Sequence, residues 1–465
     1  MRRRIMSKRL TFFILLMIIV CTIFNSVKAQ QWSAFGSGVT WQVNSIVRFN
    51  NNLWVASDYP CYFDGSNWIT VDNGLIYPLG VGVFYTLAVF NNTLFGGGFF
   101  TVLTPENNWY NNVARLHNGS WTTCGNGLGD DGCGIDGEVY YLIEYNGNLY
   151  AGGNFGSAGG DPLSPQEVGY IARFDGSLWH PVGSGVNDKI TDMAVYDNKL
   201  VVSGYFTEAG GIPANHVSCW DGSTWSALGS GTDGKVTALA VHDGCLYIGG
   251  LFDTAGGSPA KNIAKWDGMK WSSVGDGLMA QVYTLASYRG KLYAGGDGIV
   301  KRYFDTPPYS IIHNIMCWDG AKWDSLGQGP DGPVNFLLSD TLGLVVGGRF
   351  TKVGELSAQN IALFNSQSGV ENNETMKPGN FSLEQNYPNP FNPITKIRFT
   401  IPERSFVSLR IYDALGKAIT TIVNKELVAG SYEYQWNAEK LSSGIYFYNL
   451  QAGKFTETKR LLLIK

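Results

Sequence analysis

A repeated unit constrains the fold of this 465-residue chain more than any other feature of its sequence. The stretch CWDGSTWSALGSGTDGKVTALAVHDGCLYIGG begins at Cys219, and similar stretches begin at Arg173 and Lys265. The Trp of the unit occurs at seven positions, with spacings of 36 to 58 residues: Trp32, Trp68, Trp121, Trp179, Trp225, Trp271 and Trp323. Self-similarity at a period of about 40 to 50 residues indicates an architecture built from one repeated supersecondary unit.

Each unit is expected to form four short antiparallel strands. Residues 236–250 predict two strands joined by a turn at Asp243-Gly244, and residues 262–271 predict a third strand, a turn and the start of a fourth. The glycine pair after the second strand allows close backbone approach, and the outer Trp is expected to wedge between neighbouring units. Such units, repeated radially, form a β-propeller with few exposed strand edges. We therefore predict an all-β chain with a propeller over residues 30–366.

The two ends of the repeat region complement each other. The first copy, QWSAFGSGV, holds only the Trp strand, whereas the last copy stops at NIALF and lacks that strand. This split copy predicts that the N-terminal strand pairs with the last C-terminal strands and closes the ring. Seven Trp strands then predict seven blades. Six or eight blades are the alternatives, because the segment between Trp32 and Trp68 is short.

The LYxGG…WDGxxW units resemble the kelch-like, galactose-oxidase-type β-propellers over about residues 31–366. Enzymes of that type hold copper with two His and two Tyr, one of which is linked to a Cys. The five histidines of this chain fall in five different copies, without metal-ligand spacing: His117, His180, His216, His242 and His313. We therefore predict no metal site, no cofactor and no catalytic residue.

Acidic residues invite two further interpretations. The stretch GDDGCGIDGE groups four carboxylates, which could bind calcium or form a solvated loop: Asp130, Asp131, Asp136 and Glu138. Their spacing is not that of an EF-hand loop, so the solvated loop is favoured. The Asp of each WDG turn occupies one repeat position, and we expect it to shape the hairpin: Asp64, Asp175, Asp221, Asp267 and Asp319.

Three aromatic residues are the candidates for ligand stacking. Trp109 and Tyr110 lie in TVLTPENNWYNN, and Tyr309 lies in DTPPYSIIHN. Both stretches interrupt the repeat between its second and third strands, and are expected to form loops on one rim of the propeller. Binding residues are often found on such loops, so these aromatics could stack on sugar rings. The alternative is that they pack over the blade below.

The N-terminus has the pattern of a secretory signal. Residues 1–29 carry six basic and no acidic side chains, and an apolar run from about Leu10 to Val27 precedes a cleavage site after Ala29. An uncleaved membrane anchor is the alternative, because the run is long enough to span a bilayer. No stable transmembrane segment is expected after cleavage. Export also makes a disulfide between Cys124 and Cys133 plausible, with two free thiols as the alternative.

The charge of the middle region excludes one class of partner. Residues 30–368 carry 16 basic and 29 acidic side chains. A protein that binds nucleic acid needs a basic face, so no nucleic-acid partner is expected.

The last part of the chain has a different composition. Residues 367–380 are a polar linker, and residues 381–465 show alternating strands that predict a small Ig-like β-sandwich. This tail resembles the type A C-terminal sorting domain of the type IX secretion system through YDALGK, SGIYFYNLQAGK, KRLLLIK and a first motif: Asn386, Tyr387, Pro388, Asn389, Pro390, Phe391, Asn392 and Pro393. The resemblance implies a Bacteroidota-type bacterium, export in two steps, and the type IX machinery as a partner. An ordinary Ig-like binding module is the alternative.

Together these features predict a protein that is secreted or held at the outer-membrane surface. Its expected function is non-enzymatic binding of an unknown glycan or protein. A carbohydrate-active enzyme, such as an oxidase or lyase on a propeller scaffold, is the alternative, and a passive structural surface protein is a third. A ligand cannot be named from the sequence.

Overall fold

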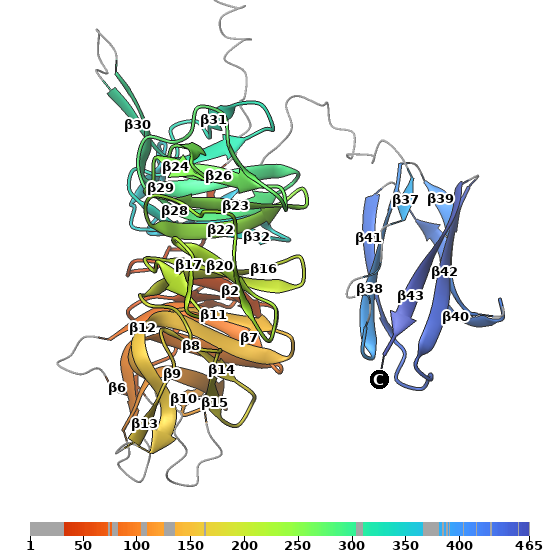
Figure 1. The fold of residues 1–465 in the computed structure, drawn as a ribbon. Coiled ribbons are helices and arrows are strands. Elements are labelled where there is room, and N and C mark those ends of the chain that lie inside the picture. The colour runs from red at the N-terminus through yellow and green to blue at the C-terminus, as the bar shows by residue number, and fades with distance from the viewer. Residues whose placement is uncertain are drawn as a thin grey trace, which may run out of the picture. The chain divides into compact units, whose positions relative to one another are not determined.

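The computed structural model describes most of the chain between Trp32 and Ile464 (Figure 1). The described residues are 32–72, 75–76, 82–103, 109–124, 135–161, 164–303, 310–365, 381–383, 386, 389, 391–402, 404–414, 416–427, 430–453 and 455–464. Within them the regular structure consists of β-strands, which confirms the all-β prediction. Contacts divide the chain into two compact units, Met1–Ser366 and Gln367–Lys465.

The first unit contains seven antiparallel sheets of four or five strands. The first three sheets, in chain order, comprise β2 (Ser45–Phe49), β3 (Asn52–Ala56), β4 (Cys61–Phe63) and β5 (Trp68–Thr70); β6 (Leu75–Ile76), β7 (Val83–Phe90), β8 (Thr93–Leu103), β9 (Trp109–His117) and β10 (Ser120–Thr122); and β11 (Ile135–Tyr145), β12 (Asn148–Asp161), β13 (Ser164–Glu167), β14 (Ile171–Phe174) and β15 (Trp179–Pro181).

The other four sheets have the same strand order. They comprise β16 (Ile190–Tyr196), β17 (Lys199–Gly204), β20 (Val217–Trp220) and β21 (Trp225–Ala227); β22 (Val236–His242), β23 (Cys245–Gly250), β26 (Ile263–Trp266) and β27 (Trp271–Ser273); β28 (Val282–Tyr288), β29 (Lys291–Tyr303), β30 (Ser310–Trp318) and β31 (Trp323–Ser325); and β32 (Val334–Asp340), β33 (Gly343–Gly348), β36 (Ile361–Phe364) and β1 (Trp32–Ala34). Three two-stranded hairpins connect second to third strands: β18 (Glu208–Ala209) with β19 (Ile212–Pro213), β24 (Thr254–Ala255) with β25 (Ser258–Pro259), and β34 (Lys352–Val353) with β35 (Leu356–Ser357).

The sheets follow one another in a cycle. One strand of each sheet contacts its counterpart in the next, in the order β2, β7, β11, β16, β22, β28 and β32, and β32 in turn contacts β2. These seven strands are called the inner strands below. Because the last inner strand contacts the first, the sheets enclose a centre.

The first glycine of the repeated pair lets neighbouring sheets approach closely. A Cβ atom at Gly249 would lie 2.6 Å from Cγ1 of Val282, the residue that begins the next inner strand. The same approach recurs in other sheets and at the closure, at Gly97, Gly152, Gly295 and Gly347. Real Cβ contacts are longer than this, so only glycine fits. The prediction for this position is confirmed.

The second glycine faces a β-bulge. A Cβ atom at Gly250 would lie 2.1 Å from the carbonyl oxygen of Lys235. The register between β22 and β23 shifts at this point, so that Thr237 is the extra residue of the inner strand. A bulge re-aims its extra residue. The glycine pair therefore serves both sheet packing and the bulge.

The repeated Trp links each sheet to the preceding one. The buried Trp271 indole N–H donates to the Leu228 carbonyl at 2.7 Å, and Leu228 follows Trp225, the Trp of the previous unit, by three residues. Equivalent bonds are made by Trp32, Trp68, Trp121, Trp225 and Trp323. A buried indole normally needs such a partner, and its ring supplies a large apolar area. The predicted position of the Trp between units is confirmed.

The Asp of the WDG turn shapes its hairpin, as predicted. Asp221 Oδ1 accepts the backbone N–H groups of Ser223 and Thr224, both at 2.8 Å. These bonds hold the pKa of Asp221 below its usual value, because they stabilise the charged carboxylate. Side chains that bind their own backbone in this way favour turns.

The ring closes through the N-terminal strand. β1 pairs antiparallel with β36, and Trp32 lies opposite Phe364, with the two ring centroids 4.8 Å apart. The Trp32 indole N–H donates to the Leu326 carbonyl at 3.1 Å, so it closes the cycle of Trp bonds. The pairing predicted for the split copy is present.

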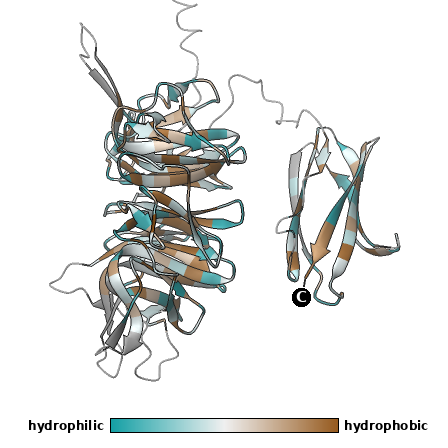
Figure 2. Cartoon of the chain, in the orientation of Figure 1, coloured by the Kyte–Doolittle hydropathy of each residue, from teal (hydrophilic) through white to brown (hydrophobic). Residues whose placement is uncertain are grey.

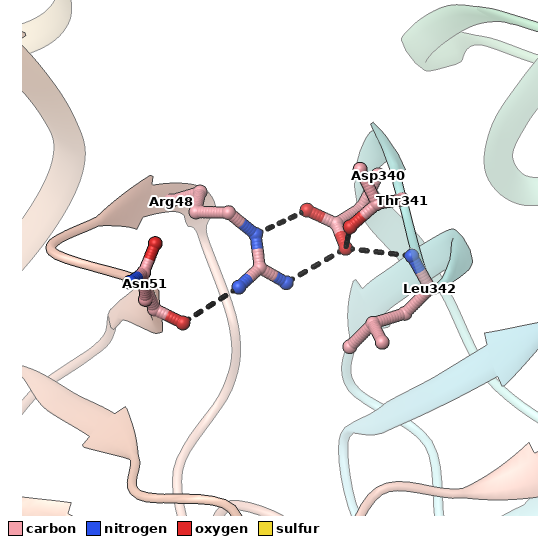
Figure 3. Close-up of polar contacts among 5 residues, drawn as sticks. All are labelled: Arg48, Asn51, Asp340, Thr341 and Leu342. Carbon is pink, nitrogen blue, oxygen red and sulfur yellow. Dashed lines mark hydrogen bonds and ion pairs between the residues drawn. The ribbon is translucent and has the colours of Figure 1, made fainter. Parts of the chain in front are cut away.

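A bidentate ion pair joins the first and last inner strands. Arg48 Nε and Nη2 donate to Asp340 Oδ2 and Oδ1 at 2.6 and 2.7 Å (Figure 3). Nη1 of Arg48 also donates to the Asn51 carbonyl, and Asp340 accepts the N–H of Leu342 at 2.9 Å. Burial alone would raise the pKa of Asp340, but the bond from Arg48 holds it below its usual value.

The second unit consists of two sheets that share one core. β37 (Ser382–Leu383), β38 (Ile394–Ile401) and β41 (Gly430–Asn437) form one sheet; β40 (Ala418–Leu427), β39 (Ser405–Asp413), β42 (Gly444–Ala452) and β43 (Phe455–Leu463) form the other. Along these strands hydrophobic and hydrophilic residues alternate (Figure 2). The inward set includes Ile397, Phe399, Leu409 and Tyr448, all at most 1% exposed.

Candidate functional site

A central cavity of about 160 Å³ lies where the inner strands converge. All seven sheets contribute to its wall at or near the start of their inner strands. The lining residues are Asn44, Ser45, Tyr85, Thr86, Tyr140, Tyr141, Thr191, Asp192, Thr237, Leu239, Tyr283, Thr284, Leu285, Asn335, Phe336 and Leu337. Asn, Thr and Tyr predominate, so the wall is polar and rich in hydroxyl groups.

The bulge residues form a ring around this cavity. Six of them are the extra residues of their inner strands, and Asn44 occupies the equivalent place before β2: Asn44, Tyr85, Tyr140, Thr191, Thr237, Tyr283 and Asn335. The residue before each is buried and apolar, for example Val43, Val236 and Val282. The bulge therefore turns one polar residue per sheet toward the centre.

Part of this ring is tied together by hydrogen bonds between sheets. Thr191 Oγ1 donates to the Val236 carbonyl at 2.7 Å, and Thr237 Oγ1 donates to the Val282 carbonyl at 2.6 Å. The amides of the two asparagines make the same link, from Asn44 to Phe84 at 3.0 Å and from Asn335 to Val43 at 3.3 Å. These bonds use the one hydroxyl proton of each threonine and one of the two amide protons of each asparagine.

A second set of side chains accepts hydrogen bonds from the next inner strand. Thr86 Oγ1 accepts the N–H of Leu142, and Thr284 Oγ1 accepts the N–H of Leu337, both at 3.2 Å. Ser45 has the same role toward the N–H of Leu87, at 3.4 Å. One position of the repeat thus satisfies an inner-strand N–H that β-ladder pairing leaves unused.

Asp192 replaces the hydroxyl at this position. Its Oδ2 accepts the N–H of Leu239 at 2.6 Å, its Oδ1 accepts the N–H of Met193 at 2.7 Å, and Tyr141 also bonds to it. The carboxylate borders the cavity and is partly buried. Desolvation raises its pKa to about 7, and the three hydrogen bonds only partly oppose this rise. Asp192 therefore changes charge near neutral pH.

Two tyrosines of the cavity wall share one glutamate as their hydrogen-bond acceptor. Tyr85 and Tyr140 both donate to Glu138, which lies two residues before the ring position of its strand. Burial raises the pKa of Tyr85 to about 12, and the charge of Glu138 adds to the shift. The pKa of Tyr140 is raised for the same reasons. Both hydroxyls are therefore neutral donors at physiological pH.

Two lysines occupy the equivalent position in the next two sheets. Lys189 Nζ lies 4.3 Å from the ring centroid of Tyr205, and Lys235 Nζ lies 5.1 Å from it. Lys235 Nζ also donates to the Tyr205 hydroxyl at 3.0 Å. A cation over a tyrosine ring is held by cation–π attraction. One position of the repeat, two residues before the ring residue, is thus acidic at Glu138 and basic at Lys189 and Lys235.

The aromatic candidates lie partly in strands. Trp109 and Tyr110 begin β9, where they pair with Leu103 and Val102 of β8, so the backbone there extends the sheet instead of forming the expected loop. Continued ladder pairing satisfies the backbone of the insertion, which explains the difference. Tyr309 lies outside the described residues. Ligand stacking by these three residues stays a prediction.

The predictions that involve cysteine, acidic loop and signal are likewise untested. Cys124 is buried, with its Sγ atom 3.7 Å from the Val113 carbonyl, but Cys133 lies outside the described residues. Ala29, Asp130 and Asp131 also lie outside them. Among the described residues, no group of three or more His, Cys, Asp or Glu side chains could hold a metal ion. No helix of the described ranges is long and apolar enough to cross a membrane.

The residues around the cavity were missed by sequence reasoning. Their signal is weak, because only the residue after one buried Val, Ile or Phe of each copy marks the ring, and its type varies among Asn, Tyr and Thr. Asp192 was missed because it follows this position in ITDMAV and resembles the ordinary polar residue of an alternating strand.

The first motif of the tail, which begins at Asn386, is fixed to the sandwich by hydrogen bonds. The Asn386 side chain is buried and donates to Thr395 at 2.9 Å, while its backbone N–H donates to the Tyr448 hydroxyl at 2.8 Å. Asn389 Oδ1 accepts the N–H of Leu462 at 2.8 Å. These bonds hold the motif against strands of both sheets. Tyr387, Pro388 and Pro390 lie outside the described residues.

Phe391 attaches this motif to the last strand by backbone hydrogen bonds. Its backbone N–H donates to the Leu462 carbonyl at 2.9 Å, and its carbonyl accepts the N–H of Ile464 at 3.0 Å. The ring is 2% exposed and lies 5.6 Å, centroid to centroid, from Trp436. Asn392 and Pro393 lead directly into β38. The motif and the C-terminal strand therefore hold each other in place.

Comparison with known families identifies the tail. Residues 385–465 match the family described as the secretion system C-terminal sorting domain, which confirms the resemblance to the type IX sorting domain. The protein is therefore secreted or attached to the outer-membrane surface, and it interacts with the type IX secretion machinery. No curated protein matches the chain.

Solved structures give remote likenesses. One is PorZ, an essential bacterial surface component of the type-IX secretion system of Porphyromonas gingivalis, with 17% identity, 93% of this chain covered and a TM-score of 0.46. This chain spans 61% of that protein. Another is the computationally designed Ika8 protein, with 15% identity, 71% of this chain and 98% of that chain covered, and a TM-score of 0.42. Both TM-scores are below 0.5, so neither likeness carries an argument about function.

Proposed function

We propose that residues 30–366 form a seven-bladed β-propeller of the kelch-like, galactose-oxidase type that binds a glycan or protein outside the cell without transforming it. The proposed cleavage after Ala29 removes the signal, and residues 367–380 link the propeller to an Ig-like sorting domain over residues 381–465. The cyclic contacts of the inner strands and the pairing of β1 with β36 support the propeller.

The observation that carries the binding proposal is the central cavity. Residues from all seven sheets line it, and most of them are polar. Ligand sites are typically concave, with a few converging polar groups on a rigid scaffold. Several of these groups are fixed in place by hydrogen bonds between sheets, so little order would have to be gained on binding.

A glycan array with the secreted protein, purified from the medium or cell surface, tests this function. Tyr283→Ala removes a cavity-lining phenol, and Met269→Ala changes a side chain that is 85% exposed on an outer turn. We expect specific binding that Tyr283→Ala weakens and Met269→Ala leaves unchanged. Binding that both variants retain would place the ligand elsewhere, and absence of any glycan or protein ligand would overturn the proposal.

A second candidate function is that of a carbohydrate lyase, which cleaves its substrate by β-elimination, and Asp192 favours it. A carboxyl group with a pKa of about 7 is suited to proton transfer near neutral pH, and it borders a cavity that Tyr140 and Tyr283 also line. Uronic-acid polysaccharides should then gain ultraviolet absorbance from unsaturated products when mixed with the protein. Asp192→Asn should abolish that signal. An unchanged spectrum in both proteins leaves non-enzymatic binding as the function.

A further inference from the structure

Four hydroxyl groups of the cavity wall have their protons engaged by the protein and keep acceptor capacity only. The hydroxyl protons of Thr191 and Thr237 are used on the Val236 and Val282 carbonyls of the next sheets. A hydroxyl has one proton and two lone pairs, so the oxygen atoms of both threonines retain acceptor capacity. Tyr85 and Tyr140 direct their protons to Glu138. A ligand that bonds to these four hydroxyl oxygens must therefore bring donors.

The charge of the wall has one sign. Among the sixteen lining residues of the cavity, Asp192 is the one carboxylate, and none is Lys, Arg or His. Glu138 is not a lining residue, and it accepts from two lining tyrosines. Lys189 and Lys235 are not lining residues either, and both are held on Tyr205. The interior is thus suited to a cationic group.

The carboxylate of Asp192 exceeds what the fold requires at its position. Thr86 and Thr284 satisfy the equivalent inner-strand N–H with a neutral hydroxyl. A buried carboxylate is less favourable than a hydroxyl, since burial disfavours its charged form. A ligand cation next to Asp192 would offset this penalty. The N–H of Leu239 requires an acceptor at this position, but it does not require a charged one.

The size and polarity of the cavity restrict which kind of ligand can bring that cationic group. A volume of about 160 Å³ is comparable with the engineered cavity of about 150 Å³ that binds benzene, so it admits one ring and not an oligosaccharide. A lysine side chain would place its apolar stem against the polar wall. A sugar ring instead brings hydroxyl donors on several sides. The wall therefore favours a sugar over a lysine.

We propose that the central cavity binds the non-acetylated amino sugar at the end of a glycan, with its ammonium group at Asp192 and its hydroxyls on Thr191, Thr237 and the tyrosines. This inference rests on the proposed binding function and names the ligand class. The ammonium donates to the carboxylate, while the sugar hydroxyls donate to the threonine oxygens. No bond is made or broken.

Calorimetric titration of the secreted protein with glucosamine, N-acetylglucosamine, glucose and lysine amide tests the inference. We expect glucosamine to bind roughly 10- to 100-fold more tightly than N-acetylglucosamine or glucose, because only its amine is charged. Equal affinities for glucosamine and glucose would overturn the inference, as would tighter binding of lysine amide. This comparison uses the unmodified protein and does not depend on the folding of a variant.

Asp192→Asn should lower the affinity for glucosamine by a similar factor, since it keeps an acceptor for Leu239 but removes the charge. Asp221→Asn makes the same charge change in an exposed turn and should leave the affinity unchanged. If Asp192→Asn binds glucosamine as tightly as the unmodified protein, the inference is wrong. Neutral sugars that bind as tightly as glucosamine and lose affinity in Tyr283→Ala would overturn the amino-sugar assignment alone, whereas failure of every glycan and protein ligand would overturn the proposed function as well.

Discussion

Replacement of Arg48 by alanine tests the closure of the ring at its most localised contact. Arg48 on β2 and Asp340 on β32 form two hydrogen bonds of 2.6 and 2.7 Å between the first and last inner strands. The Asp340 side chain is only 5% exposed, whereas that of Arg48 is 33% exposed. The substitution leaves a nearly buried carboxylate without its charged partner.

The expected loss of stability follows from this asymmetry. Removal of one partner of a fully buried ion pair costs about 3 to 5 kcal/mol, and partial exposure of the other reduces this cost. Because Asp340 keeps the N–H of Leu342 at 2.9 Å, we expect Arg48→Ala to lower the free energy of unfolding by about 2 to 3 kcal/mol. Asp340→Asn should cost less, about 1 kcal/mol, because it removes the charge and keeps an acceptor.

Urea unfolding of the secreted protein, monitored by tryptophan fluorescence, measures both effects. The matched control is Arg404→Ala, which breaks an exposed ion pair with Glu426 whose side chains are 73% and 60% exposed. This control should change the free energy of unfolding by less than about 0.5 kcal/mol. The pKa of Asp340 is held below its usual value, so the stabilisation by Arg48 should be complete above about pH 4 and decrease as the pH falls further. If Arg48→Ala unfolds like the control, the contact does not contribute to closure.

Three further predictions concern other parts of the structure. Gly249→Ala should destabilise the first unit by about 1 to 3 kcal/mol, since the new Cβ would lie 2.6 Å from Val282 Cγ1, while Gly156→Ala, with no atom within 4 Å, should be neutral in the same urea titration. The pKa of Asp192 rises from 3.8 to about 7 on folding, so the folded state binds the proton more tightly than the unfolded state. The free energy of unfolding should therefore fall by roughly 1 to 3 kcal/mol between pH 4 and 7, and melting curves of Asp192→Asn across that range should lack this pH dependence. Asn386→Ala removes a buried bond to Thr395 and should lower the melting temperature of the tail and the amount of protein at the surface, whereas normal surface levels would contradict this role of the motif.

The architecture could be predicted because its determinants are local and repeated. Trp271 and its counterparts mark each unit, and their indole bonds go to the carbonyl three residues after the Trp of the preceding unit. The split copy predicts the pairing of Trp32 with the end of the repeat region, because an open ring would leave a strand edge unpaired. The sorting motif could be recognised for a similar reason, since Asn386, Asn389 and Phe391 each have a fixed structural partner.

The cavity could not be predicted because it depends on contacts between units. Thr191 and Thr237 look like ordinary strand residues until a bulge turns them toward the centre. Asp192 lies 47 residues before the Leu239 N–H that it accepts, and nothing in ITDMAV distinguishes it from an exposed acid. The sequence around Trp109 predicts a loop, because hydrophobic and polar residues do not clearly alternate where its backbone pairs with β8.

The central claim is that the tail exports the protein and that the first unit is what it delivers. A chain that ends at residue 366 keeps its N-terminal segment and all seven repeat Trp residues. Cell fractionation with an antibody against the first unit should find the full-length protein at the surface or in the medium, and the shortened chain in the periplasm. Residues 367–465, fused to an unrelated exported protein, should carry that protein out. If the shortened chain reaches the surface as efficiently as the full-length protein, the tail does not direct export and the account is contradicted.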